Sequence, residues 1–313
     1  MEAKSKKILF VLLFAICFLP QIGPAVALVC GILFSLMFGN PWPKQVAVLS
    51  KKLLQISVVG LGFGLSLATV VKVGANSIVY TIVGITFTLA IGWGLGRIIG
   101  TSPTQSLLIS FGTAICGGSA IAAMSPVIQA KDDEVAISLA TIFTLNAVAL
   151  LLFPWLGHLL GFTQQQFGLW SALAIHDTSS VVGAASAFGA VALAVGTTVK
   201  LTRALWIMPC ALIASMFKKS GQRAPFPLFI LGFILAAAAH TFIPLMENCW
   251  SFLAVAAKQS LVVTLFLIGS GLSREVLGRV GFRPLLQGVL LWIIVSSLTA
   301  AVIMYGVIEV TGF

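Results

Sequence analysis

The chain has 313 residues, of which 59% are hydrophobic and 8% are charged, and its formal net charge is +10. Soluble domains carry about 25% charged residues, so this composition excludes an ordinary water-facing surface. The mean hydropathy of +1.11 agrees with this exclusion. An integral membrane protein is expected, with the lipid bilayer as its surroundings and no soluble catalytic or DNA-binding domain. The basic residues lie in short loops between apolar segments, where they orient helices, and nucleic acid is not an expected partner.

Apolar segments of about 20 residues are long enough to cross a bilayer. In chain order the sequence predicts such segments at 8–19, 22–39, 52–71, 77–99, 104–126, 134–160, 167–194, 197–217, 226–243, 250–272 and 284–308. The first follows three lysines and resembles a signal peptide, but the apolar character continues through Phe38 and favours a retained hairpin. The predicted fold class is an all-α membrane protein, a polytopic bundle of about 10–11 transmembrane helices that forms a single domain over residues 1–313.

Basic residues between the segments predict an orientation, because Lys and Arg favour the cytoplasmic side. If every segment crosses, one side collects the N-terminal lysines and Lys44, Lys51, Lys52, Arg97, Lys218, Lys219, Arg223, Arg274, Arg279 and Arg283. Lys72, Lys131 and Lys200 then fall on the other side. The prediction is a bacterial inner-membrane protein with a cytoplasmic N-terminus and a periplasmic C-terminus.

Residues 51–74 align without gaps to residues 258–281 at a constant offset of 207, with eight identities in 24 positions. Among the identical pairs are Gly62 with Gly269 and Gly64 with Gly271. The two segments are seven predicted crossings apart, so they run in opposite directions. Inverted repeats of this kind are typical of secondary transporters.

Two polar runs interrupt apolar segments, at residues 112–119 and 175–183. Glycines, hydroxyls, a histidine and an aspartate are costly in lipid unless they line a cavity or the bundle interior, so two discontinuous helices are predicted. The runs match each other loosely at an offset of 60, which does not fit one symmetry with the offset of 207. Whether residues 104–126 and 167–194 span the bilayer or re-enter is left open.

A broken membrane helix offers unpaired N–H groups and a positive dipole end where its second half begins, and these attract anions. An anion is therefore predicted near Gly118 and Ser119 and near Thr178–Ser180. Lys200 and Arg203, three residues apart on one helix face, would offset its charge if they face inward, or reach lipid headgroups if they face outward. The predicted substrate-binding residues are Thr113, Cys116, Gly117, Gly118, Ser119, Thr178, Ser179, Ser180, Lys200 and Arg203. The alternative is that the small residues only allow close helix packing.

His176 and Asp177 are the predicted proton or ion coupling residues, because histidine titrates near neutral pH and its environment can shift either group. The structural alternative is a helix cap at Asp177 and a hydrogen-bonded histidine. Asn146, in the middle of a segment, joins helices or lines the cavity. No nucleotide-binding loop, zinc motif or paired-cysteine motif occurs, so no enzyme activity, cofactor or metal site is predicted.

The stretches GTAICGGSAIAA at 112–123, AIHDTSSVVGAA at 174–185 and KLTR at 200–203 resemble the signature of the YeiH-like sulfate exporter family, a conserved bacterial inner-membrane family. The resemblance covers essentially the whole chain. It implies an exporter of sulfate or sulfite. Together with the polar runs, it leads us to expect a secondary transporter that exports a small anion such as sulfate, sulfite or an organosulfonate, with coupling to H+ or Na+. Two other functions stay open: a sodium-coupled symporter or cation/proton antiporter, and a non-transporting membrane scaffold or sensor. A homo-oligomer is also left open.

Overall fold

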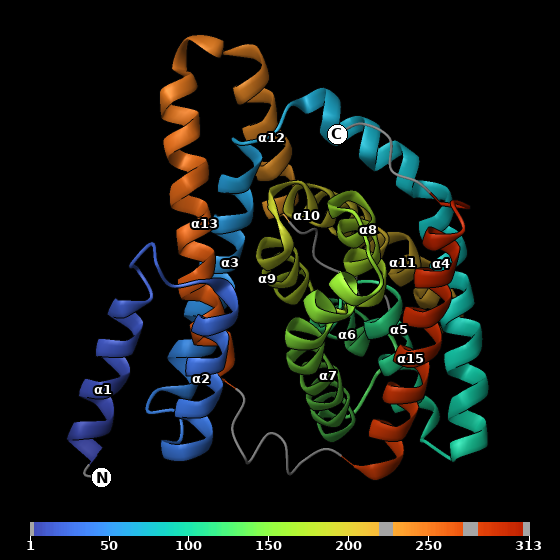
Figure 1. Cartoon of the computed structure of the whole chain (residues 1–313). Helices are drawn as coiled ribbons and strands as arrows, with labels where there is room; N and C mark the ends of the chain where they lie inside the picture. The colour runs from blue at the N-terminus through green and yellow to red at the C-terminus, as the bar shows by residue number, and fades with distance from the viewer. Residues whose placement is uncertain (1–2, 219–227, 272–280, 309–313) are drawn as a thin grey trace. The chain divides into compact units, whose positions relative to one another are not determined.

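A computed structural model describes residues 3–218, 228–271 and 281–308, and every regular element in these ranges is helical. The chain divides into two compact units (Figure 1): unit 1 is Met1–Val71 with Leu228–Leu277, and unit 2 is Lys72–Pro227 with Gly278–Phe313. Five helices of the described part are long and apolar enough to cross a bilayer, at Leu67–Ile99, Asp132–Leu159, Ala190–Ala214, Pro244–Ser270 and Phe282–Met304. The predicted polytopic helical membrane fold is therefore confirmed, while the single domain over 1–313 stays a prediction.

Unit 1 is built around the internal repeat. Its elements are α1 (Ala3–Ile16), α2 (Pro24–Phe38), α3 (Pro43–Gly62), the start of α4 (Leu67–Ile99), α12 (Leu228–Phe242), the 3-10 turn η1 (Pro244–Met246) and α13 (Glu247–Ser270). The repeat places α3 opposite α13, and these two helices pack along each other. They are antiparallel, because Gly60 lies against Ala257 whereas Gly64 lies against Ala254. The part of the repeat at 272–280 lies outside the described residues.

Equivalent glycines in the repeat make equivalent close approaches. A Cβ atom on Gly62 of α3 would lie 2.5 Å from the carbonyl oxygen of Phe233 in α12. A Cβ atom on Gly269 of α13 would collide with the carbonyl oxygen of Leu28 in α2. Helix α3 thus packs on α12, and its counterpart α13 packs on α2. This exchange is expected if α2–α3 and α12–α13 are two copies related by a pseudo-two-fold axis.

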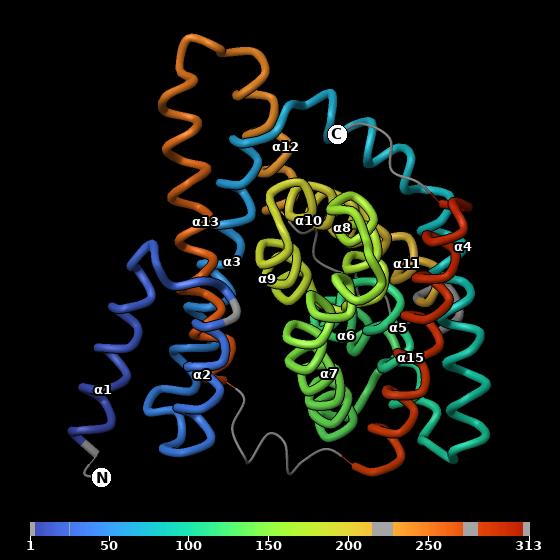
Figure 2. The backbone as a smooth tube through the Cα atoms, in the orientation of Figure 1, coloured from blue at the N-terminus to red at the C-terminus, as the bar shows by residue number. Residues whose placement is uncertain are grey.

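Unit 2 comprises the rest of α4 together with α5 (Pro103–Ala114), α6 (Gly118–Val127), α7 (Asp132–Leu159), α8 (Gln164–Ala174), α9 (Thr178–Phe188), α10 (Ala190–Leu205), α11 (Ile207–Lys218) and α15 (Phe282–Met304). Figure 2 traces this path, in which α10 packs on both α8 and α9. The two predicted discontinuous helices are present as α5–α6 and α8–α9, with breaks at residues 115–117 and 175–177.

Both broken helices double back as hairpins. At the base of the first, the Ser102 hydroxyl donates to Glu134 Oε1 at 3.0 Å, so α5 and α7 begin at the same end of unit 2. Nearer its tip, a Cβ atom on Gly112 would lie 3.1 Å from the Ile121 side chain, which places α6 back along α5. At the base of the second, the rings of Phe167 and Phe188 stack at 3.9 Å.

The two hairpins enter from opposite ends of α7. The base of the first lies at the start of α7, whereas His158, in the last turn of α7, stacks on Phe188 at 4.3 Å. Each hairpin is followed by one long helix, so the two copies are inverted with respect to each other. The two offsets are therefore separate relations: the offset of 60 relates the two hairpins of unit 2, and the offset of 207 relates helices α3 and α13 of unit 1.

Several predicted boundaries were wrong for local reasons. The segment predicted at 52–71 ends at Gly62, and α4 begins at Leu67 because the Ser66 hydroxyl accepts the Thr69 N–H at 3.1 Å. The segment predicted at 167–194 ends at Phe188, and Gly189 separates α9 from α10. Among the predicted orientation charges, Lys219, Arg223, Arg274 and Arg279 lie outside the described residues.

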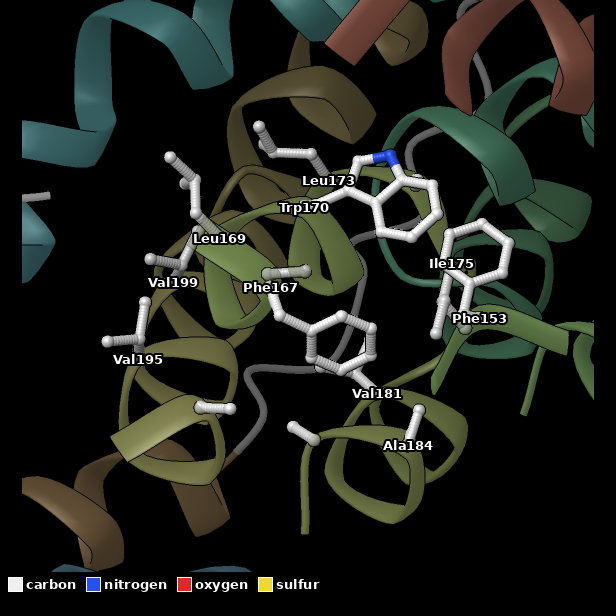
Figure 3. Packing of buried hydrophobic residues seen from close by; sticks show 14 of the residues in the cluster. Phe153, Phe167, Leu169, Trp170, Leu173, Ile175, Val181, Ala184, Val195 and Val199 are labelled. Carbon is white, nitrogen blue, oxygen red and sulfur yellow. The ribbon is translucent and has the colours of Figure 1, made fainter. Parts of the chain in front are cut away.

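An aromatic core supports the second hairpin (Figure 3). Trp170 of α8 stacks on Phe153 of α7 at 4.2 Å, and Phe153 stacks on Trp292 of α15 at 5.7 Å. The Trp170 indole N–H donates to the carbonyl oxygen of Ser296 at 2.9 Å, which satisfies the one polar atom of that side chain. The tip of the second hairpin therefore lies on a packed, fixed base.

Candidate functional site

The tip of the first hairpin is formed by Ile115, Cys116 and Gly117. Helix α5 ends at Ala114, because Ile115 leaves the helical conformation with φ −117° and ψ −84°. Gly117 then turns the chain with φ 66° and ψ −128°, a conformation open essentially only to glycine. Helix α6 begins directly afterwards at Gly118; its N-cap Gly117 has no side chain, and the Cys116 thiol faces the backbone N–H of Ala120. The first N–H groups of α6 lack partners within their own helix and form a positive dipole end inside unit 2.

The tip of the second hairpin is formed by Ile175, His176 and Asp177. Asp177 is the N-cap of α9: its Oδ1 accepts the Ser180 N–H at 2.6 Å, and its Oδ2 accepts the Ser179 hydroxyl at 2.7 Å. The structure therefore has the helix cap that the sequence offered as an alternative for Asp177. Because the carboxylate already holds Ser179 and Ser180, these predicted substrate residues are engaged within the tip.

The two tips lie against each other. A Cβ atom on Gly117 would lie 2.9 Å from the Asp177 Cβ, so only glycine allows this approach. Half-helices α6 and α9 consequently begin side by side, each with its positive dipole end at the contact. Gly118 and Thr178 are partly exposed and Ser119 is exposed, whereas Gly117 and Cys116 are buried.

Asn146, in the middle of α7, joins the second tip to the long helix. Its Oδ1 accepts the backbone N–H of Asp177 at 3.4 Å and lies 3.2 Å from His176 Nδ1. Since a backbone N–H can only donate, the Asn146 atom facing it is an acceptor, and His176 Nδ1 must carry a proton to donate to the same oxygen. The neutral ring then presents Nε2 as a bare acceptor.

Several polar atoms of unit 2 are buried and form no hydrogen bond with the described residues. They include His176 Nε2 and Asn146 Nδ2, and bulk water cannot reach either atom because His176 is 0% and Asn146 3% exposed. Five buried threonine hydroxyls of unit 2 share this state, those of Thr81, Thr101, Thr113, Thr197 and Thr198, and among these Thr113 directly precedes the last residue of α5. An unmade hydrogen bond in a dry interior costs about 1–3 kcal/mol, so such a set is typical of a site that a ligand or water completes.

Lys200 and Arg203 of α10 both face inward and are 0% and 1% exposed. The Lys200 ammonium donates to the carbonyl oxygens of Ile175 at 2.7 Å and Ala172 at 3.3 Å. Arg203 donates from Nε to the Ala114 oxygen at 2.6 Å, and from Nη1 to the Leu173 oxygen at 2.6 Å. The outward orientation towards lipid is therefore wrong for both residues, and Lys200 is not an orientation charge.

The sequence thus indicated the two tips, and the structure brings Gly117, Asp177, Lys200 and Arg203 into one cluster. The sequence did not indicate that the hydroxyls of Thr197 and Thr198 are buried without partners, because these residues resemble ordinary helix hydroxyls. The pairing of Asn146 with His176 was also not foreseen. Among the described residues, no three His, Cys, Asp or Glu side chains gather closely enough to hold a metal ion.

Comparison with known proteins gives consistent relatives. The family described as "Conserved hypothetical protein 698" matches residues 9–288. A UPF0324 membrane protein of Geobacter sulfurreducens is 61% identical over 290 residues, which cover 93% of this chain and 94% of the relative. UPF0324 membrane proteins of Bdellovibrio bacteriovorus and Bacteroides thetaiotaomicron are each 50% identical, over 97% and 91% of this chain and 96% and 87% of their own lengths. No solved structure matches the chain at a significant level.

Proposed function

The chain belongs to the family described as "Conserved hypothetical protein 698", the YeiH family that its signature stretches resemble, and for this member we propose secondary active transport of a small anion. The cargo class is sulfate, sulfite or an organosulfonate, exported across the bacterial inner membrane. The observation that carries the proposal is the contact between the two hairpin tips, where half-helices α6 and α9 begin side by side inside unit 2.

The start of α6 is the better of the two anion sites. Its N-cap, Gly117, has no side chain, and Gly118 and Ser119 are accessible there, so the N–H groups of these two residues are available to a ligand, whereas the Ala120 N–H faces the Cys116 thiol. The start of α9 already holds the Asp177 carboxylate. An anion would also be a suitable acceptor for the buried Asn146 Nδ2 and the unpaired threonine hydroxyls.

Asp177 and His176 supply a route to proton coupling. Protonation of Asp177 removes the negative charge from the start of α9 and weakens its bond to the Ser180 N–H, so that a cargo anion can compete with the neutral cap for that N–H. His176 Nε2 is the second proton acceptor, because Asn146 fixes the proton of the neutral ring on Nδ1. Proton binding and anion binding therefore favour each other in this scheme.

The alternative of sodium coupling has less support. It requires unwound carbonyls and the ends of half-helices as ligands. The carbonyls of Ala114, Ala172, Leu173 and Ile175 accept from Lys200 and Arg203 instead. A non-transporting scaffold would leave the buried unpaired polar atoms at the tips without a purpose.

A cytoplasmic N-terminus remains part of the proposal. In unit 2, Lys131 lies at the base of the first hairpin beside the start of α7, and Arg283 Nη1 donates to the Gly100 oxygen at 3.2 Å. The doubling back of this hairpin moves Lys131 to the end that holds Arg97 and Arg283. The sequence placed Lys131 opposite most of the basic residues on the assumption that segment 104–126 crosses the bilayer. With the hairpin, Lys131 joins the other basic residues, which agrees with the preference of positive charge for the cytoplasmic side.

Purified protein in liposomes loaded with radiolabelled sulfite or sulfate, with and without a pH gradient, tests the proposal. Saturable flux that responds to the gradient is expected from the wild type, and its loss from a variant carrying His176→Ala and Asp177→Asn. His158→Phe is the matched control, since it removes an imidazole at the far end of α7, keeps the ring that stacks on Phe188 and should keep full flux. Wild-type flux in the double variant would refute the coupling role, and flux no greater than that of empty liposomes would remove these anions as cargo.

A further inference from the structure

We infer that Lys200 and Arg203 are resident cations that occupy the carbonyl ends of α5 and α8, so that unit 2 binds no metal cation there. Cation-coupled transporters use the carbonyl ends of broken half-helices to coordinate sodium. In this chain the same kind of position is filled by two side chains of the protein. The inference goes beyond the proposed function, because it concerns ion dependence and holds whatever the cargo is.

The end of α8 shows that Lys200 and Arg203 take two of its last four carbonyls and one carbonyl of the break. The last four carbonyls of a helix have no partner within it. In α8 the Ser171 oxygen is taken by the Ile175 N–H. The Ala172 and Leu173 oxygens accept from Lys200 and Arg203, and the Ile175 oxygen in the break accepts from Lys200.

Arg203 serves both hairpins with one guanidinium group. Its Nε bonds the Ala114 oxygen, the last residue of α5, while Nη1 bonds the Leu173 oxygen near the end of α8. Both bonds are short, at 2.6 Å, and charged donors form shorter hydrogen bonds than neutral ones. A planar guanidinium can bond both oxygens at once, because its donors are held in a fixed fork.

The charges of Lys200 and Arg203 are offset in part by helix dipoles and in part by the nearby Asp177 carboxylate, which acts on Lys200 without forming an ion pair with it. In the described part of the chain the one ion pair joins His240 to Glu247, and neither Lys200 nor Arg203 pairs with a carboxylate. A helix C-terminus carries the equivalent of about half a negative charge, so two such ends together offset roughly one positive charge. Removal of either cation therefore leaves buried, unpaired carbonyls that could accept a replacement cation.

The test uses thermal unfolding of purified protein in detergent, which does not depend on transport. The wild-type melting temperature should be the same in sodium chloride and in choline chloride. Lys200→Ala should lower it by on the order of 5–10 °C, because two charged hydrogen bonds are lost from a fully buried position. Propylammonium, which matches the deleted atoms, should restore a large part of that loss.

Two variants serve as controls. Lys200→Met fills the same volume without a charge, so it should be destabilised and should not respond to propylammonium. Lys72→Ala removes an exposed lysine and should leave the melting temperature unchanged. A saturable rise of the wild-type melting temperature with sodium, or a Lys200→Met variant as stable as the wild type, would overturn the inference. The sodium titration needs no variant, and none of these outcomes depends on flux.

Discussion

Gly117→Ala is the sharpest single perturbation of the two-tip contact. Gly117 has φ 66° and ψ −128°, a region that residues with a Cβ atom essentially avoid. The added methyl group would also lie 2.9 Å from the Asp177 Cβ and 3.2 Å from its Cα. The substitution therefore meets a backbone penalty and a steric penalty at the same point.

The size of the effect follows from these two terms. Strain at a glycine-only conformation costs about 1–3 kcal/mol, and overpacking of a dense interior costs about 1–3 kcal/mol. The free energy of unfolding should then fall by about 2–6 kcal/mol in total. At roughly 2–4 °C per kcal/mol, this lowers the melting temperature by about 5–20 °C. Flux should fall as well, because the starts of α6 and α9 are forced apart.

Thermal unfolding of the purified variant, followed by intrinsic fluorescence or size-exclusion chromatography after heating, measures the change. Gly84→Ala and Gly94→Ala are matched controls within α4, since no atom lies within 4 Å of the Cβ position at either glycine. Both should be neutral or slightly stabilising, because alanine is the better helix former. A Gly117→Ala protein with the wild-type melting temperature and flux would refute the tip contact.

Two further predictions concern the cap and the hairpins. Asp177→Ala should lower the free energy of unfolding by about 0.5–2 kcal/mol, while Asp177→Asn keeps the cap and most of the stability; equal loss in both, measured by melting temperature, would argue against the cap. In a cysteine-free background, Gln105→Cys and Asp133→Cys should react with an impermeant maleimide from one side of the membrane. Leu160→Cys and Ala190→Cys should react from the other side, and labelling of Gln105→Cys and Asp133→Cys from opposite sides would show that the first hairpin crosses.

The sequence was sufficient to locate both tips. Gly117 and the run from His176 to Ser180 are incompatible with a continuous apolar helix, so the breaks could be placed within a residue or two. The direction of the chain after each break could not be predicted. A half-helix of about ten residues continues across the bilayer or returns according to tertiary packing, here of α6 along α5 and of Phe188 on Phe167.

The hydrogen-bond partners of Lys200 and Arg203 could not be predicted from the sequence for another reason. Their spacing of three correctly predicted one shared helix face, but their acceptors are backbone carbonyls, which every residue has. Sequence therefore suggested a substrate anion as the counter-charge, since anions are the usual partners of lysine and arginine. The assignment of these two residues to the substrate stays a prediction, while their bonds to the hairpin ends are a feature of the structure.

The shared guanidinium of Arg203 has a mechanical consequence. It ties together two hairpins that enter from opposite ends of unit 2, so neither can swing open alone without leaving a charged hydrogen bond unmade. At about 1.5–3 kcal/mol per bond, such a lone opening would be populated in roughly one molecule in ten to one in 150. The two tips should accordingly move together as one rigid body. Access of water or cargo to the tips should then change through movement of the surrounding helices and not through separation of the two tips.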